Sequence, residues 1–204
     1  KGSSASVRAQ RNATLFNIKK GLNGIVTTVE SLCQLYPNVK SFFDSSLILK
    51  KGMTADIFEV AQKLVAAGYR RSEQITSVGE FSRKGDILDV FCPSHENPVR
   101  IEFFGDEIDD VRIFDKLTKK SIEKIDQAQI IPLNQFFASD FDADQVKELV
   151  FYSLSRQKLD ANGENRLKTV AEDAFLALDN GDFSNSWLMP FVKTSTLCDY
   201  LPKD

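Results

Sequence analysis

The chain has 204 residues, of which 42% are hydrophobic and 27% charged, and its formal net charge is −3. This composition is that of a globular protein with room for two modest units, and it argues against autonomous nucleic-acid binding, which needs a basic surface. No run of 18 apolar residues occurs and no apolar leader follows Lys1, so we expect a cytoplasmic protein. Because the chain opens without methionine, we expect it to be a piece of a longer one.

The cysteines are three in number and none of them forms a CxxC pair. This usage favours a reducing compartment over an oxidising one. We expect all three thiols, Cys33, Cys92 and Cys198, to be buried as small apolar side chains.

The first predicted element is a helix over residues 5–20, ended by Gly21 at a natural C-cap position. Its apolar side chains fall close to one helical face, namely Val7, Leu15, Ile18 and Leu22. After an Asn23-Gly24 turn, the β-branched run 25–29 predicts a short buried strand whose neighbours we expect outside this chain. A brief helical stretch to Tyr36-Pro37 follows.

A second unit is expected to open with the apolar run 47–49. Thr54 is then predicted to cap a helix that Gly68 closes. The spacing of its apolar residues is helical, with one face formed by Ile57, Val60, Ala61, Leu64 and Val65.

From Tyr69 to Leu133 the apolar period changes to two, which predicts an antiparallel meander. We expect strands at 80–83, 86–92, 99–104 and 107–114, separated by Gly-containing or Pro-containing turns. Two alternating sets are predicted to face the core together, Leu88, Val90 and Cys92 with Val99, Ile101 and Phe103. The alternation slips near Asp109-Asp110, which indicates a β-bulge or a wider turn there.

Beyond Pro132 the helical period returns, with Asp142 predicted to cap a helix and a second helix ending before Gly181. The apolar residues of the first are Val146, Leu149, Val150 and Leu154, and those of the second include Leu167, Val170, Ala171, Ala174, Phe175 and Leu178. We expect the last helical turns to cover the same surface with Trp187, Leu188, Phe191, Leu197 and Leu201.

Catalytic and metal-binding patterns are poorly represented. The single histidine, His95, has no second histidine or spaced cysteine beside it, so we expect an exposed loop residue rather than a metal ligand or a triad member. The stretch 101–107 ends in Asp106-Glu107 and resembles a magnesium-binding Walker B strand, but no G-x-x-x-x-G-K-[ST] loop accompanies it. Gly105 before this pair favours a hairpin turn.

The predicted strand 99–104 places Arg100, Glu102 and Phe104 on the face opposite its core residues. An aromatic ring on the wet face is unusual, and Arg and Phe supply contact area at binding hot spots. Phe104 could instead be covered by a neighbouring loop. With Arg83 and Lys84 in the adjacent turn, these residues predict a basic and aromatic patch suited to an acidic protein surface.

Three runs, GYR at 68–70, GEFSRKGDILDVF at 79–91 and PVRIEFFGDEID at 98–109, closely resemble the second domain of the UvrB-like module in bacterial transcription-repair coupling factors. The flanks GIVTTVESL at 24–32, LILKKG at 47–52 and IPL at 131–133 agree with that module. The resemblance is densest from 46 to 133 and loose from 134 to 204.

This resemblance implies a docking domain for UvrA, the damage-recognition ATPase, in a large ATP-dependent DNA translocase that displaces stalled RNA polymerase. The family's binding residues fall on Arg100, Phe104 and Lys84. The family pattern has arginine at the last of these positions. Since lysine cannot form a planar bidentate clamp, Arg83 is the candidate to take over this role.

The resemblance also implies an α/β (α+β) fold, in which an antiparallel β-meander domain with a packed helix is flanked by a partial helical, RecA-like domain. The expected boundaries are 1–45 for the end of the first domain, 46–133 for the docking domain and 134–204 for the return into the first. No cofactor or metal is expected in this fragment, because ATP and magnesium belong to the motor of the parent protein. We expect the fragment to be monomeric, with RNA polymerase and double-stranded DNA as partners of the parent and no membrane partner.

Three alternatives stay open from the sequence. One is the corresponding domain of the repair helicase UvrB, which shares the meander and also binds UvrA. Another is a nucleic-acid-binding β-domain that uses Phe81, Phe91 and Phe104 as stacking platforms, against the charge balance. An uncharacterised hydrolase is the third, although the sequence offers no nucleophile and base pair.

Overall fold

The computed structural model describes residues 5–21, 25–158 and 160–202. Its contacts divide the described residues into two units. Unit 1 combines 5–21 with 43–133, and unit 2 combines 25–42 with 134–158 and 160–202. Both mix helices with antiparallel strands, so the predicted α/β class is confirmed. The three-part division of the chain stays a prediction. In the described ranges no helix is both long and apolar enough to cross a bilayer.

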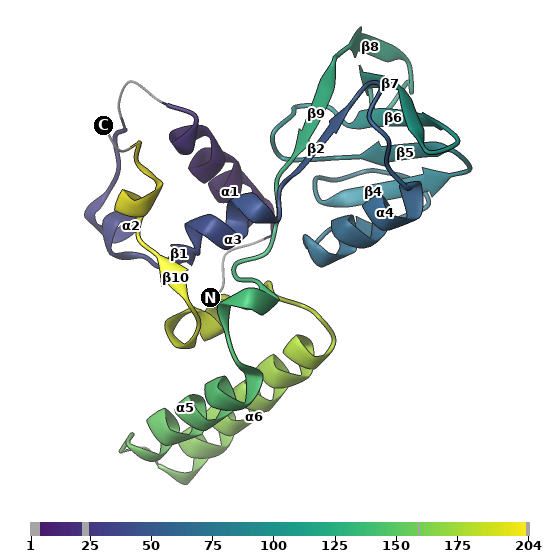
Figure 1. Cartoon of the computed structure of the whole chain (residues 1–204). Helices are drawn as coiled ribbons and strands as arrows, with labels where there is room; N and C mark the ends of the chain where they lie inside the picture. Colours follow the sequence, from purple (N-terminus) through teal and green to yellow (C-terminus); the bar gives the residue numbers. More distant parts are fainter. Residues whose placement is uncertain (1–4, 22–24, 159, 203–204) are drawn as a thin grey trace. The chain divides into compact units, whose positions relative to one another are not determined.

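Six strands of unit 1 form one sheet in the order β3-β4-β5-β6-β7-β8 (Figure 1). All neighbours pair antiparallel except β3 with β4. The strands are β3 (Arg70–Arg71), β4 (Glu80–Lys84), β5 (Ile87–Val90), β6 (Val99–Phe104), β7 (Glu107–Phe114) and β8 (Ser121–Lys124). The predicted meander is therefore confirmed, whereas β8 was missed because all four of its residues are exposed and show no apolar alternation.

The irregularity predicted near Asp109 is a β-bulge. Glu102 pairs with Asp110, whereas its neighbour Phe103 pairs with Ile108, so Asp109 is the extra residue of β7. The bulge lets both Ile108 and Val111 face the core, where each is 0% exposed, although one has an even and the other an odd number.

One helix of unit 1, α4 (Ile57–Ala66), follows strand β2 (Leu47–Lys50), which pairs antiparallel with β9 (Gln127–Ile130). The cap of α4 is Asp56, whose carboxylate accepts a hydrogen bond from the backbone N–H of Phe58 at 2.6 Å. The prediction of Thr54 as the cap was wrong because the chain stays extended for two more residues, and Thr54 forms an isolated bridge to Glu107 instead.

The other helix of unit 1 is α1 (Ala5–Lys19), and Gly21 after it has a φ of 97°, as expected of a C-cap glycine. Leu15 and Ile18 are buried as predicted, but Val7 is 52% exposed. Leu22 lies outside the described residues.

Residues 25–29 do not form the buried strand that their β-branched side chains predicted. Thr28 caps a short helix, α2 (Val29–Cys33), and Val26 is fully exposed. Since strand propensity reflects packing against neighbours, a β-branched run with no partner strand in the described part of the chain has no reason to extend. The predicted Asn23-Gly24 turn lies outside the described residues.

Unit 2 is built on an antiparallel pair of helices, α5 (Ala143–Ser155) and α6 (Ala161–Asp179), with Asp142 capping α5 as predicted (Figure 1). Their shared core continues into the 3-10 helix η2 (Ser186–Phe191), which buries Leu188 and Met189. The remaining elements are β1 (Tyr36–Pro37), α3 (Val39–Asp44), η1 (Ala138–Asp140), β10 (Thr194–Ser195) and η3 (Leu197–Tyr200). Tyr200 is buried and donates a hydrogen bond to the Pro37 carbonyl at 2.8 Å, so η3 packs near β1 rather than with the core of α5, α6 and η2, and Leu201 is 38% exposed.

The cysteines are all free, and only Cys92 is buried. The prediction of buried thiols was wrong for Cys33 and Cys198, because both lie in short helical turns on the surface of unit 2.

Candidate protein-docking surface

Strand β6 alternates between buried and accessible side chains as the sequence predicted. Val99 and Ile101 are 0% exposed and Phe103 is 6% exposed, while Arg100 and Glu102 are half-buried. Phe104 is 83% exposed, so among the described residues no loop covers its ring. The alternative in which Phe104 is shielded by a loop was therefore wrong.

The strand register shows which side chains share the sheet face of Arg100, because residues directly opposite in an antiparallel pair point to the same side. Asp89 pairs with Arg100, Ile87 with Glu102 and Lys84 with Ile87. We call this the outer face, and its members are Ser82, Lys84, Ile87, Asp89, Arg100, Glu102, Phe104, Asp110, Arg112 and Lys124. Three of the four predicted docking residues, Arg100, Phe104 and Lys84, thus lie on one face.

Arg83 points to the other side of the sheet. It pairs with Leu88, which pairs with Ile101, and both of these are buried. We call this side the inner face. The Arg83 guanidinium lies 3.6 Å from the ring centroid of Phe58 on α4, so α4 covers the inner face at this point. Arg83 and Lys84 were both expected at the edge of the docking face, but neighbouring residues of a strand project to opposite sides, so of the two only Lys84 lies on the outer face.

The guanidinium of Arg100 is held by Asp89. Its Nε and one terminal nitrogen donate hydrogen bonds to the two carboxylate oxygens at 2.7 and 2.8 Å. This hydrogen-bonded pairing raises the pKa of Arg100 against the opposing effect of burial. The same guanidinium lies 4.8 Å from the ring centroid of Phe114, which is 1% exposed, so Arg100 also shields an aromatic ring of the outer face.

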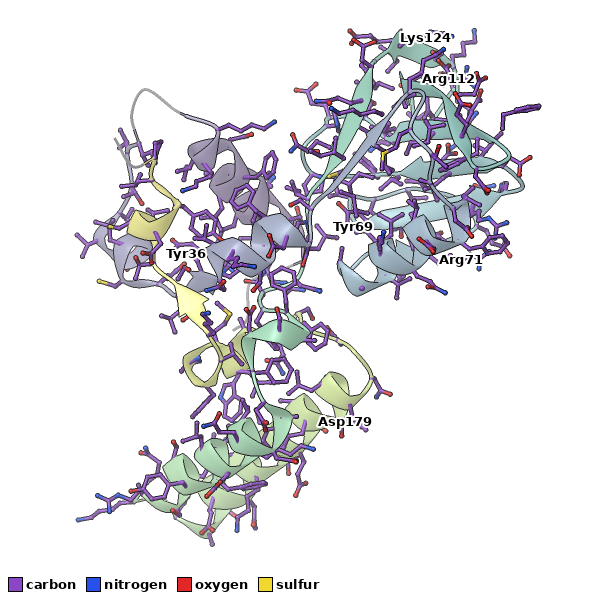
Figure 2. The ribbon with its side chains drawn as sticks, in the orientation of Figure 1. Tyr36, Tyr69, Arg71, Arg112, Lys124 and Asp179 are labelled. Carbon is purple, nitrogen blue, oxygen red and sulfur yellow. The ribbon has the colours of Figure 1, made fainter. Side chains whose placement is uncertain are left out.

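A second ion-pair group on the outer face includes Arg112 and Lys124, which are labelled in Figure 2. Arg112 bonds to Glu102 and lies 3.6 Å from an oxygen of Asp110, which in turn lies 3.2 Å from the ammonium of Lys124. The sequence analysis did not identify the acidic partners of Arg100 and Arg112. For Arg100 a signal was available, because placing the core residues Leu88 and Ile101 opposite each other sets Asp89 opposite Arg100. The outer face therefore alternates acids and bases around the exposed ring of Phe104.

The pair Asp106-Glu107 lies at the turn between β6 and β7, where Gly105 has a φ of 62°. The carbonyl of Asp106 accepts a hydrogen bond from the Ala55 N–H at 2.7 Å. This is hairpin geometry, as predicted, rather than a strand end that presents carboxylates. No group of three or more His, Cys, Asp or Glu side chains in the described ranges could hold a metal ion.

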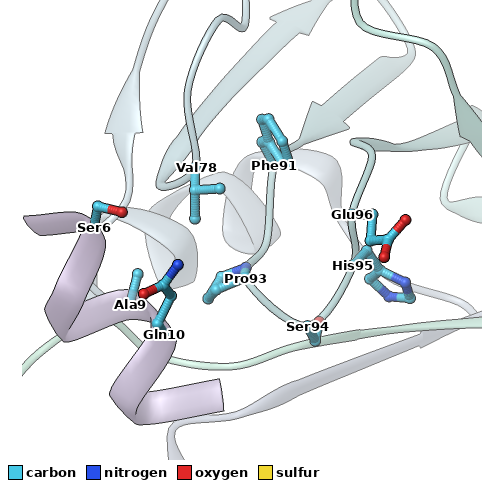
Figure 3. A pocket seen from close by; sticks show the side chains of 9 residues that line it. All are labelled: Ser6, Ala9, Gln10, Val78, Phe91, Pro93, Ser94, His95 and Glu96. Atoms are coloured by element: carbon cyan, nitrogen blue, oxygen red, sulfur yellow. The ribbon is translucent and has the colours of Figure 1, made fainter. Parts of the chain in front are cut away.

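A pocket of about 300 Å³ in unit 1 lies between α1 and the loop after β5 (Figure 3). Ser6, Ala9 and Gln10 line it from the helix, and Phe91, Pro93 and Ser94 are among the residues that line it from the loop. His95 also lines it and is half-buried rather than exposed, which corrects the expectation for this residue. Burial lowers its pKa, with a further contribution from the charge of Lys20. The hydroxyl of Ser94, beside His95, donates a hydrogen bond to the Gln129 carbonyl at 2.8 Å.

The aromatic residues that a stacking platform would need are mostly inaccessible. Phe81 is 1% and Phe91 is 4% exposed, so Phe104 alone of the three candidates presents its ring. This burial counts against the nucleic-acid-binding alternative, which needs several accessible rings along one groove.

Comparison with known proteins shows which domain contains the six-stranded sheet. Residues 47–136 match the model of the UvrB interaction domain. Over 98% of its length the chain is 31% identical to the transcription-repair-coupling factor of Staphylococcus haemolyticus and 30% identical to that of Staphylococcus epidermidis. It is also 29% identical to the factor of Staphylococcus aureus strain bovine RF122. The chain spans less than a fifth of the length of these relatives. The chain is thus similar over nearly its whole length to a segment of transcription-repair-coupling factors, and its residues 47–136 match the UvrB interaction domain.

Proposed function

We propose that this chain is the UvrA-docking segment of a transcription-repair coupling factor and that the outer face is its contact surface. One observation carries the proposal. Phe104 presents an 83% exposed ring on the same face as Arg100 and Lys84, in the domain that matches the UvrB interaction model. An exposed aromatic ring on a face that also carries an arginine has the residue types that protein-binding hot spots favour.

The parent protein supplies the remaining activities in this proposal. The ATP-dependent translocase motor, its magnesium, and the contacts with RNA polymerase and double-stranded DNA lie outside this segment, which binds no cofactor and acts as a monomer in the cytoplasm. The hairpin position of Asp106-Glu107 supports this division, because a Walker B pair stands at the end of a strand beside a phosphate-binding loop. The similarity to transcription-repair-coupling factors over nearly the whole chain supports a coupling factor over UvrB.

The direct test is titration of purified UvrA with the chain by calorimetry. Saturable binding that Phe104→Ala weakens supports the outer face as the contact surface. Absence of binding by the wild-type chain contradicts the proposal.

The absence of a nucleotide site is tested separately by titrating the chain with ATP and magnesium. We expect no saturable heat. A micromolar dissociation constant, about −8 kcal/mol, would return Asp106-Glu107 to a Walker B role.

A further inference from the structure

The arginines on the six-stranded sheet differ in whether a carboxylate already binds them. Arg70 pairs with Glu80, Arg100 with Asp89, and Arg112 with Glu102 and Asp110. No ion pair found among the described residues includes Arg83, and its Nε is shielded from solvent without a hydrogen-bond partner. The charge of Arg83 is therefore not compensated by any of these carboxylates, and since its Nε is shielded, its terminal nitrogens are the donors left for an external acceptor.

The guanidinium of Arg83 lies over the ring of Phe58. The guanidinium carbon lies 3.6 Å from the ring centroid, and the ring itself is 58% exposed. The Asp56 cap fixes the backbone of Phe58 at the start of α4. Stacking on a ring leaves the edge of a guanidinium open, and that edge matches the two oxygens of a carboxylate.

The stack borders the same edge of the sheet as Phe104. Arg83 and Lys84 precede the turn at Gly85, and the carbonyl of Asp86 in that turn accepts a hydrogen bond from the Phe103 N–H at 2.8 Å. The β6 to β7 turn is tied to the segment before α4 by the Ala55 bond to Asp106. We call this the turn edge. Phe104 lies on its outer side, and the stack of Arg83 on Phe58 lies on its inner side.

We propose that the Arg83-Phe58 stack is a second anchor, which binds a carboxylate on an acidic segment of the partner docked on the outer face, so that the partner wraps around the turn edge. This inference rests on the proposed function. Charge decides the occupant, since an unpaired guanidinium on an exposed ring selects a planar anion. A carboxylate that approached Arg100 would have to displace Asp89, whereas at Arg83 it displaces only water.

The test is the affinity of purified UvrA for variants of the chain. We expect Arg83→Ala to weaken binding about tenfold and Arg83→Lys to weaken it several-fold, because lysine keeps the charge but loses the planar fork. Phe58→Ala should weaken binding by a similar factor. The double variant should be about as weak as Arg83→Ala alone, because both changes remove one stacked unit. Arg71→Ala is the matched control, since Arg71 is exposed on β3 and should change affinity less than about twofold.

The salt dependence of UvrA affinity distinguishes the loss of a charge contact in Arg83→Ala from a loss of packing. The affinity difference between the wild-type chain and Arg83→Ala should shrink as salt rises from about 0.05 to about 0.5 M. Thermal unfolding checks that each variant is folded.

Two results overturn the inference while leaving the proposed function intact. One is UvrA binding in which Arg83→Ala and Phe58→Ala match the wild-type chain. The other is binding of single-stranded DNA that Arg83→Ala abolishes, which would make the acceptor a phosphate. If the wild-type chain does not bind UvrA at all, the proposed function and this inference both fail.

Discussion

The two faces of the six-stranded sheet shield their side chains in different ways. On the inner face Leu88, Ile101 and Val111 are 0% exposed and pack without polar partners. On the outer face Arg100 and Arg112 are half-buried because neighbouring carboxylates neutralise them. Burial of apolar surface gives the inner face its stability, whereas paired charges let the outer face stay close to water without an uncompensated charge. Phe104 fits neither arrangement, because it is apolar and exposed.

The largest expected effect comes from the inner face. Ile101→Ala leaves a cavity between the sheet and its cover, so the free energy of unfolding should fall by about 2–5 kcal/mol. Urea unfolding followed by circular dichroism measures this loss. A change below about 0.5 kcal/mol would show that Ile101 is not part of the core.

On the outer face, Phe104→Ala should weaken UvrA binding by about 2 kcal/mol, about thirtyfold, and leave the melting temperature within a few degrees. Removing an exposed ring creates no cavity, so the binding and folding effects separate. Calorimetry and thermal unfolding of the same preparation measure both. A variant that melts like Ile101→Ala would place Phe104 in the core instead.

Arg100 should show both effects at once. Arg100→Ala uncovers Phe114 and leaves the half-buried carboxylate of Asp89 without its partner. We expect the free energy of unfolding to fall by about 1.5 kcal/mol, in addition to the weaker UvrA binding. Asp89→Asn is the matched variant, which should lose a similar stability while keeping the arginine. A free energy of unfolding that is unchanged in Arg100→Ala would show that the Arg100–Asp89 pair does not stabilise the fold.

Glu80, on β4, gives the sheet a pH dependence. Burial of the carboxylate opposes its ionisation, but hydrogen bonds from Thr76, Arg70 and Ser77 outweigh burial and lower its pKa to about 2. The ionised form therefore stabilises the fold at neutral pH, and this contribution is lost as the pH falls from the ordinary value of 4.5 toward about 2.

Melting curves measured between neutral pH and pH 3, in this chain and in Glu80→Gln, test that contribution. The variant should lose on the order of 1 kcal/mol at neutral pH and show a shallower acid transition. Parallel pH profiles for the two chains would contradict the assignment.

The smallest effect is expected from Lys84. Its side chain is exposed and forms no ion pair among the described residues, so Lys84→Ala should weaken UvrA binding by well under about 1 kcal/mol. Calorimetry at low salt measures it. A loss as large as that of Phe104→Ala would move the centre of the docking surface toward the β4 to β5 turn.

Much of unit 1 was predictable because its residues repeat a pattern. The alternation over 99–104 set the faces of β6, and its slip at Asp109 located the bulge. Residues 25–29 show the limit, since a β-branched run forms a strand only beside a partner strand. The helix caps show the same limit. Asp142 was correctly predicted to cap α5, whereas Thr54 was predicted in place of Asp56 for α4. Both Thr and Asp are good N-cap residues, so residue type alone does not decide which of two nearby candidates caps the helix.

By itself the sequence determined which side of β6 each residue occupies, because a strand has a period of two and an apolar set must be buried. It therefore placed Arg100 and Phe104 on one accessible face, and the runs 68–70, 79–91 and 98–109 carried the resemblance to the family. Only the tertiary structure decided which arginines already have a carboxylate partner. That pairing depends on the register between strands and on the helix that covers each face, so Asp89 binds Arg100 while Arg83 stacks on Phe58. Long-range contacts of this kind are not written in the local pattern of any one segment, because each requires two distant segments to be brought together.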